Sequence, residues 1–214
     1  MLKKFFENTR HPEGLGGRIM LAMMNSGHVS MAKWGLSFLP IRPEHHILDI
    51  GCGGGANMAV MLQQASEGKV CGIDYSALSV EKAISVNQDA VAEGRAEVRQ
   101  ASVSELPYDA ETFDIVTAFE TVYFWPDFQN DLREVYRVLK PGGVFFICNE
   151  ETRQDGDQSP AKGFEKLLSL NVYSPQEFHV HLTGAGFRDV TIHYAEKKSW
   201  LCVTAVKPKT FDPL

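Results

Sequence analysis

The chain has 214 residues, a formal net charge of −6 and 44% hydrophobic residues, which fits one domain with a sizeable core. The acidic balance argues against a protein built to coat nucleic acid or an anionic membrane surface. The sequence shows no signal-peptide core, no apolar run near the ~20 residues of a membrane span and no C-x-x-C pair. We therefore expect a cytoplasmic protein with four reduced core cysteines, no nucleic-acid partner and no membrane span.

Residues 1–43 precede the first predicted strand and are predicted to form an N-terminal helical cap. Helices are predicted at 18–25 and 28–39, between segments rich in glycine and proline. Four methionines besides the first residue lie here, and methionine adapts to irregular apolar partners. Two interpretations stay open: a lid whose Met24 and Trp34 contact an apolar substrate, or ordinary packing of these helices on a sheet.

The main domain, predicted at 44–214, begins with a strand at 46–50, a glycine turn and a helix at 55–66. A strand, a glycine turn and a helix together outline a phosphate- or nucleotide-binding corner. Glycine is needed at Gly51 because the turn requires dihedral angles that a Cβ disfavours. The pattern G-x-G-x-x-A that starts there also satisfies the dinucleotide fingerprint, so any adenosine cofactor fits at this point.

Two acidic residues flank this corner. Asp49 lies two residues before Gly51, where a carboxylate would repel a pyrophosphate but suits a ligand with an ammonium group and a sulfonium cation. The alternative is a capping or turn-bonding aspartate. Asp74 ends the predicted strand 69–74 and would accept hydrogen bonds from a ribose diol. Its alternative is a solvated carboxylate at a strand end.

The remaining elements keep alternating between strand and helix. They are predicted as a helix at 77–91, strands at 96–101 and 112–119, a helix at 128–139 capped by Asp127, a strand at 144–148, a short helix at 161–170, a helix opened by the capping box at Ser174–Glu177, and a hairpin of strands at 187–194 and 199–206. The alternation predicts an α/β, doubly wound, seven-stranded and mostly parallel sheet with an antiparallel last strand.

The run I-L-D-I-G-C-G-G-G-A at 47–56 resembles the glycine motif of class I S-adenosylmethionine-dependent methyltransferases, and V-L-K-P-G-G at 138–143 resembles their motif leading into the fifth strand. The resemblance covers roughly residues 40–207 and is closest to small stand-alone bacterial-type members that act on small molecules. It implies a Rossmann-like fold, S-adenosylmethionine as cofactor, S-adenosylhomocysteine as product and in-line methyl transfer. In this family the segment before the glycine motif commonly covers the cofactor, which supports the lid interpretation.

The resemblance also implies which residues meet the cofactor. The glycine turn and Asp49 would hold its methionine portion, Asp74 its ribose hydroxyls, and Tyr75 would lie against adenine. Ser102 stands where the family often has an aspartate for the adenine amino group, and its hydroxyl or the Val103 N–H can serve instead. The predicted cofactor-binding set is Asp49, Gly51, Cys52, Gly53, Asn57, Asp74, Tyr75, Ser102, Val103 and Phe119.

The run 119–127 faces the transferable methyl group in this family. Aromatic faces there stabilise a sulfonium cation and shape an apolar pocket, and Trp125 is a predicted substrate contact. Many relatives carry histidines near Tyr123, but this chain has none. A base is needed only if the nucleophile arrives protonated, and the candidates are then Tyr123, Glu120 and His28.

We expect the substrate between the N-terminal helices, the 123–125 loop and the 150–172 segment, with the acceptor atom (O, N, C or S) left open. No metal is predicted, because His179 and His181 would point to different sides of a helix. Two alternatives stay open. One is an NAD(P)-dependent oxidoreductase, favoured by the dinucleotide fingerprint. The other is a non-catalytic S-adenosylmethionine-binding regulatory protein that keeps the pocket without turnover.

Overall fold

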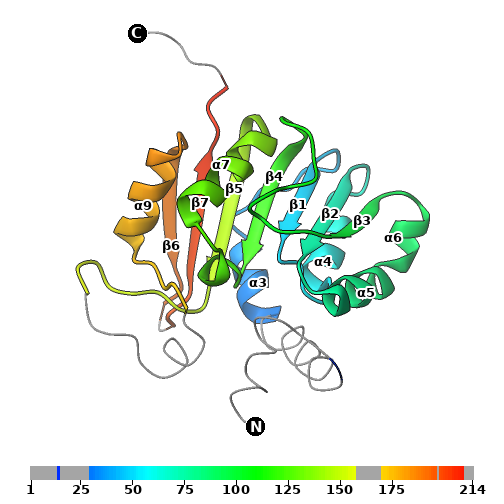
Figure 1. Cartoon of the computed structure of the whole chain (residues 1–214), viewed down its shortest axis with the longest axis horizontal. Coiled ribbons are helices and arrows are strands. Elements are labelled where there is room, and N and C mark those ends of the chain that lie inside the picture. Colours follow the sequence, from blue (N-terminus) through cyan, green and yellow to red (C-terminus); the bar gives the residue numbers. More distant parts are fainter. Residues whose placement is uncertain (1–13, 15–28, 158–169, 197, 210–214) are drawn as a thin grey trace.

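The computed structural model describes residues 14, 29–157, 170–196 and 198–209 (Figure 1). Its sheet has seven strands: β1 (His46–Ile50), β2 (Lys69–Asp74), β3 (Ala96–Gln100), β4 (Phe113–Phe119), β5 (Leu139–Asn149), β6 (Arg188–Tyr194) and β7 (Leu201–Val206). The strand order is β3-β2-β1-β4-β5-β7-β6. β1 to β5 pair in parallel, and β7 runs antiparallel to both β5 and β6. The predicted α/β doubly wound fold is confirmed.

Most of the described helices begin and end close to their predicted bounds, but the 3-10 helix after β4 was not predicted. The described helices are α3 (Val29–Leu36), α4 (Ala56–Gln64), α5 (Ala77–Val86), α6 (Gln88–Ala92), the 3-10 helix η1 (Val122–Phe124), α7 (Phe128–Val138) and α9 (Pro175–Gly184). Asp127 caps α7 by accepting from the Asn130 N–H, and Ser174 and Glu177 form the predicted capping box of α9. The predicted helices at 18–25 and 161–170 lie outside the described residues, apart from Leu170, which is not helical.

Two predicted elements differ from the structure. The helix predicted at 77–91 breaks into α5 and α6 at Asn87, whose buried amide Nδ2 donates to the carbonyls of Ala83 and Gly55. The fifth strand begins at Leu139 rather than at 144, because α7 ends at Val138 and Leu139 pairs with Phe113 of β4.

The core has one apolar cluster on each face of the sheet. Along β5, Phe145 and Ile147 belong to the cluster that α7 and α9 cover, whereas Phe146 and Cys148 belong to the cluster that α3 and α4 cover (Figure 1). This alternation is the period of two expected of a strand buried on both faces.

Helix α3 lies directly against β5 and β7. A Cβ added at Gly35 would lie 2.6 Å from Cys148 Sγ and 2.8 Å from Cys202 Sγ. The two thiols face each other across the strand pair with their sulfurs 3.1 Å apart, and both are free and buried. Trp34 of α3 also packs against Trp200, with ring centroids 6.0 Å apart. Among the helices described, none combines the length and apolar character that crossing a bilayer requires.

Candidate active site

The glycine turn follows β1 at the carboxyl end of the parallel strands. Gly51 has φ +71°, and a Cβ there would lie 2.4 Å from Thr121 Cγ2. Gly55 has φ +79°, and a Cβ there would lie 2.6 Å from Asn87 Nδ2. Both positions therefore need glycine for two reasons, the left-handed backbone and the lack of space. At Gly53 (φ +52°), among the residues that the structure describes, none besides its chain neighbours places an atom within 4 Å of the Cβ position, so the backbone is open to a ligand on that side.

Asp74 lies beside this turn. Its Oδ2 accepts from the Gly53 N–H at 3.0 Å and its Oδ1 from the Ser76 N–H at 2.9 Å. These bonds tie the acid at the end of β2 to the turn after β1. Its contact with a ribose stays a prediction. The next side chain, Tyr75, is 47% exposed, so its ring can lie along a ligand.

Asp49 lies inside the sheet rather than at an exposed strand end. It is 2% exposed, and its Oδ1 accepts from Thr117 Oγ1 at 2.7 Å. Burial raises the pKa of its carboxyl to about 7; the Thr117 bond opposes that rise, and the charge of Asp74 adds to it. A direct contact between Asp49 and the cofactor stays a prediction.

The other predicted cofactor residues surround the same strand ends. Ser102 is exposed after β3 and its Oγ accepts from the Ser104 N–H at 3.2 Å, while Val103 is buried. Cys52 is buried, and burial raises the pKa of its thiol. Asn57 is half-buried in the first turn of α4, and Phe119 at the end of β4 is 6% exposed.

Two predicted catalytic residues meet at the carboxyl end of β4. Glu120 adopts φ +58°, a left-handed conformation that non-glycine residues rarely take and that often marks functional sites. Its carboxylate accepts from the Glu150 N–H and lies 3.3 Å from the hydroxyl of Tyr123. That hydroxyl also accepts from the Glu151 N–H at 2.9 Å. An acid and a phenol are thus held together beside the end of β5.

The surroundings of this pair change the pKa of both groups. Burial raises the pKa of Glu120 to about 8, although the bond from the Glu150 N–H opposes the rise. Burial likewise raises the pKa of Tyr123 well above its usual value. Acidic groups whose pKa values are strongly shifted by burial are candidates for proton transfer.

The predicted substrate and base residues from the N-terminal segment are only partly described. Met24 and His28 lie outside the described residues. Trp34 packs against Trp200. Trp125 is 4% exposed and stacks on Phe145 with ring centroids 6.1 Å apart, so its indole belongs to the core. The substrate contacts assigned to Met24, Trp34 and Trp125 stay predictions.

Several supporting residues of the site were not predicted from the sequence. Thr121 donates from Oγ1 to the Ile50 carbonyl at 3.1 Å and fastens the loop after β4 to the glycine turn. Thr117 holds Asp49, and Asn87 holds the turn at Gly55. Their positions in the sequence could have identified these residues, because residues at the carboxyl ends of the adjacent strands β1 and β4 lie at the same edge of the sheet.

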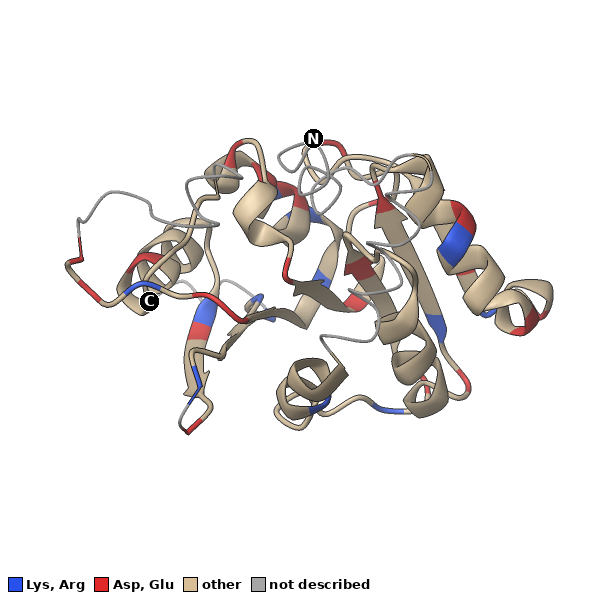
Figure 2. Cartoon of the chain, turned by 90° about the horizontal axis from the view of Figure 1, so that it is seen from below, with Lys and Arg blue, Asp and Glu red and all other residues tan. Residues whose placement is uncertain are grey.

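Figure 2 looks onto that edge, where acidic segments surround the ends of the central strands. Such a surround suits a ligand that carries cationic groups.

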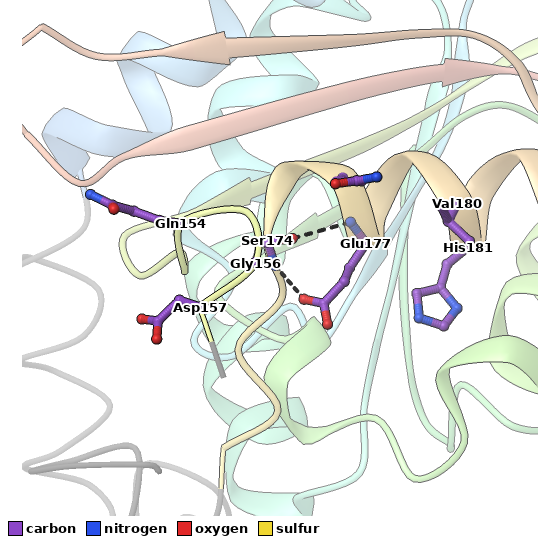
Figure 3. A pocket seen from close by; sticks show the side chains of 8 residues that line it. Gln154, Gly156, Asp157, Ser174, Glu177, Val180 and His181 are labelled. Carbon is purple, nitrogen blue, oxygen red and sulfur yellow. Dashed lines mark hydrogen bonds between the residues drawn. The ribbon is translucent and has the colours of Figure 1, made fainter. Parts of the chain in front are cut away.

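A separate hollow of about 290 Å³ lies between α9 and the loop after β5 (Figure 3). Its lining residues are Gln154, Gly156, Asp157, Ser174, Gln176, Glu177, Val180 and His181. None of them comes from the glycine turn. Within the described part of the chain, no three His, Cys, Asp or Glu side chains are grouped to hold a metal ion.

Comparison with known proteins connects this geometry to a family. Residues 48–147, from β1 to β5, match the methyltransferase domain family. The chain is 33% identical over 153 residues to 27-O-demethylrifamycin SV methyltransferase of Amycolatopsis mediterranei, covering 69% of this chain and 56% of that protein. It is 26% identical to the uncharacterized methyltransferase YdaC of Bacillus subtilis, covering 88% of this chain and 97% of that one.

The fold also resembles solved methyltransferase structures. The geranyl diphosphate C-methyltransferase of Streptomyces coelicolor, solved with S-adenosylhomocysteine, aligns with a TM-score of 0.74 at 15% identity over 83% of this chain and 75% of that one. Residues 48–147 therefore form a methyltransferase domain, and the matches support the class I S-adenosylmethionine-dependent type. The chain spans about half the length of several other curated relatives that it matches. The methyltransferase matches decide against the oxidoreductase interpretation.

Proposed function

We propose that this chain transfers a methyl group from S-adenosylmethionine to a small-molecule acceptor. The observation that carries the proposal is the Asp74 carboxylate bonded to the Gly53 N–H of the left-handed turn. The space beside Gly53 is open, and a Cβ there would narrow it. The residues present therefore leave room for the cofactor to approach the backbone of the turn. The small-molecule acceptors in the names of curated relatives, a demethylated rifamycin and demethylmenaquinone, support the acceptor class.

In the proposed site, the turn backbone and Asp49 hold the amino acid end of the cofactor, and Asp74 binds its ribose. When bound, the cofactor supplies a methyl group on a sulfonium, which is reactive enough that alignment and water exclusion provide much of the acceleration. Tyr75, Ser102 and Val103 hold the adenine end.

Glu120 is the proposed base for an acceptor that arrives protonated. As the acceptor atom takes the methyl group, its proton passes to the Glu120 carboxylate, either directly or through the Tyr123 hydroxyl 3.3 Å away. Tyr123 is itself held by the backbone of Glu151. Because the pKa of Glu120 is raised to about 8, the basic form increases as the pH rises through that value, and so should the rate. His28 remains the alternative base.

The proposal extends to two further properties. Residues 1–43 form the cap over the site, with α3 as its described part. The chain acts in the cytoplasm, which the four free cysteines support because oxidising compartments favour disulfides.

The test is a thermal-shift panel followed by turnover. A ligand at 100 times its Kd adds about 2.7 kcal/mol of stability, so S-adenosylhomocysteine should raise the melting temperature whereas NAD should leave it unchanged. Formation of S-adenosylhomocysteine is then followed with fractions of a bacterial metabolite extract as acceptors. No shift with S-adenosylhomocysteine would refute the proposal. A shift without turnover on any fraction would favour the non-catalytic binding protein.

A further inference from the structure

Four residues form a hydrogen-bonded chain between the two loops that border the proposed site. One loop follows β3 and contains Ser102, the predicted adenine contact. The other follows β4 and contains η1 with Tyr123. The chain starts at Ser102, whose Oγ accepts from the Ser104 N–H at 3.2 Å. The Ser104 hydroxyl in turn donates to Asp131 Oδ1 at 2.7 Å.

Asp131 connects this first loop to the second. Its other carboxylate oxygen, Oδ2, accepts from the Asp127 N–H at 3.1 Å, where the loop after β4 ends and α7 begins. The side chain of Asp131 is 0% exposed. Burial raises the pKa of its carboxyl, while the bond from Ser104 opposes the rise. A buried carboxylate is costly unless its oxygens are paired, so both bonds are needed.

Helix α7 holds the rest of the first loop as well. Glu134 accepts from the Leu106 N–H at 3.0 Å, and Arg137 donates to the carbonyl of Tyr108 at 2.7 Å and to that of Leu106 at 3.0 Å. The loop after β3 is therefore hydrogen-bonded along one face of α7. The first residue of α7 directly follows the loop after β4.

We infer that Asp131 is a positioning residue that couples cofactor binding to the placement of the loop at 121–127. This inference rests on the proposed function. Occupation of the adenine side fixes Ser102 and Ser104, and Asp131 transmits that order to Asp127 and hence to Tyr123 and Trp125. The coupling is reciprocal, so disturbing the link weakens cofactor binding as well. If Asp131 only stabilised the start of α7, it would need only the bond from the Asp127 N–H, not the one from Ser104.

The matched variants are Ser104→Ala, which removes one bond and keeps the helix cap, and Ser104→Thr, which keeps the hydroxyl. Trp34→Phe and Trp200→Phe are introduced first, so that Trp125 is the remaining tryptophan of the three. S-adenosylhomocysteine is titrated by calorimetry, and acrylamide quenching of Trp125 is measured with and without it.

Trp125 is 4% exposed, so acrylamide reaches its ring only when the loop at 121–127 fluctuates. In the background protein, S-adenosylhomocysteine should reduce that quenching. Ser104→Ala should weaken S-adenosylhomocysteine binding about fivefold, at the low end of measured couplings, and abolish that protection. Ser104→Thr should restore both. Wild-type binding and protection in Ser104→Ala would overturn the inference, and so would a loss of thermal stability with unchanged binding. Absence of S-adenosylhomocysteine binding in the wild-type protein would overturn the proposed function, and this inference with it.

Discussion

Glu120→Gln tests the buried acid at the end of β4. The folded protein raises the pKa of this carboxyl from 4.5 to about 8, so between these values the native state keeps a proton that the unfolded chain has lost. Stability from this group is complete below pH 4.5 and is lost as the pH rises through about 8. Glutamine has the same shape, accepts from the Glu150 N–H through its oxygen and does not titrate.

The expected magnitude follows from the shift. Each pKa unit corresponds to about 1.4 kcal/mol, so wild type should lose on the order of 4–5 kcal/mol relative to Glu120→Gln between pH 4.5 and 9. Urea unfolding of both proteins across this range gives the difference directly, because other titrating groups, Asp49 included, contribute equally to both. The turnover of Glu120→Gln should fall about 10²–10⁴-fold, without the rise of rate around pH 8.

Parallel stability curves for the two proteins would refute the reasoning, because they would mean that the carboxyl titrates alike in the folded and unfolded chain. Asp49→Asn serves as a matched comparison. The pKa of Asp49 is raised from 3.8 to about 7, so the stability difference from wild type should develop at lower pH and level off above pH 7.

Three further predictions concern binding and stability. Asp74→Ala should abolish the stabilisation by S-adenosylhomocysteine, about 2.7 kcal/mol at 100 times the wild-type Kd, in a thermal-shift assay; an unchanged shift would exclude a ribose contact. In Gly51→Ala the new Cβ would lie 2.4 Å from Thr121 Cγ2. Gly94 has the same left-handed backbone, but the space around its Cβ position is open. Gly94→Ala should therefore cost only about 1–2 kcal/mol in urea unfolding and Gly51→Ala clearly more, and equal costs would contradict the clash. Trp125→Ala should cost about 3–5 kcal/mol by the same measurement, and unchanged stability would mean that its ring is not part of the core.

The sheet could be predicted from the sequence because its signals are local. The bounds of β1 and β2 agree with those predicted, since apolar runs of strand length end at glycines or at a polar residue. The capping box at Ser174 set the start of α9. The break at Asn87 was not predictable, because it depends on an amide that bonds a carbonyl 32 residues earlier in the chain.

The candidate site was predictable only where a motif marks it. The glycine turn and Asp74 follow from spacing, and the structure brings them together. The burial of Asp49 and Trp125 did not follow, because exposure at the end of a strand depends on the helices and loops that cover it. The raised pKa of Glu120 is likewise a product of tertiary burial rather than of sequence pattern.

The contact at Gly35 limits how substrate and product can enter and leave. The two sulfurs of Cys148 and Cys202 occupy the space that any residue larger than glycine would need at position 35. Helix α3 therefore packs directly against the sheet. A helix seated this closely cannot swing aside without separating from both strands beneath it. We therefore expect the described part of the proposed cap to stay packed on the sheet while substrate and product enter and leave.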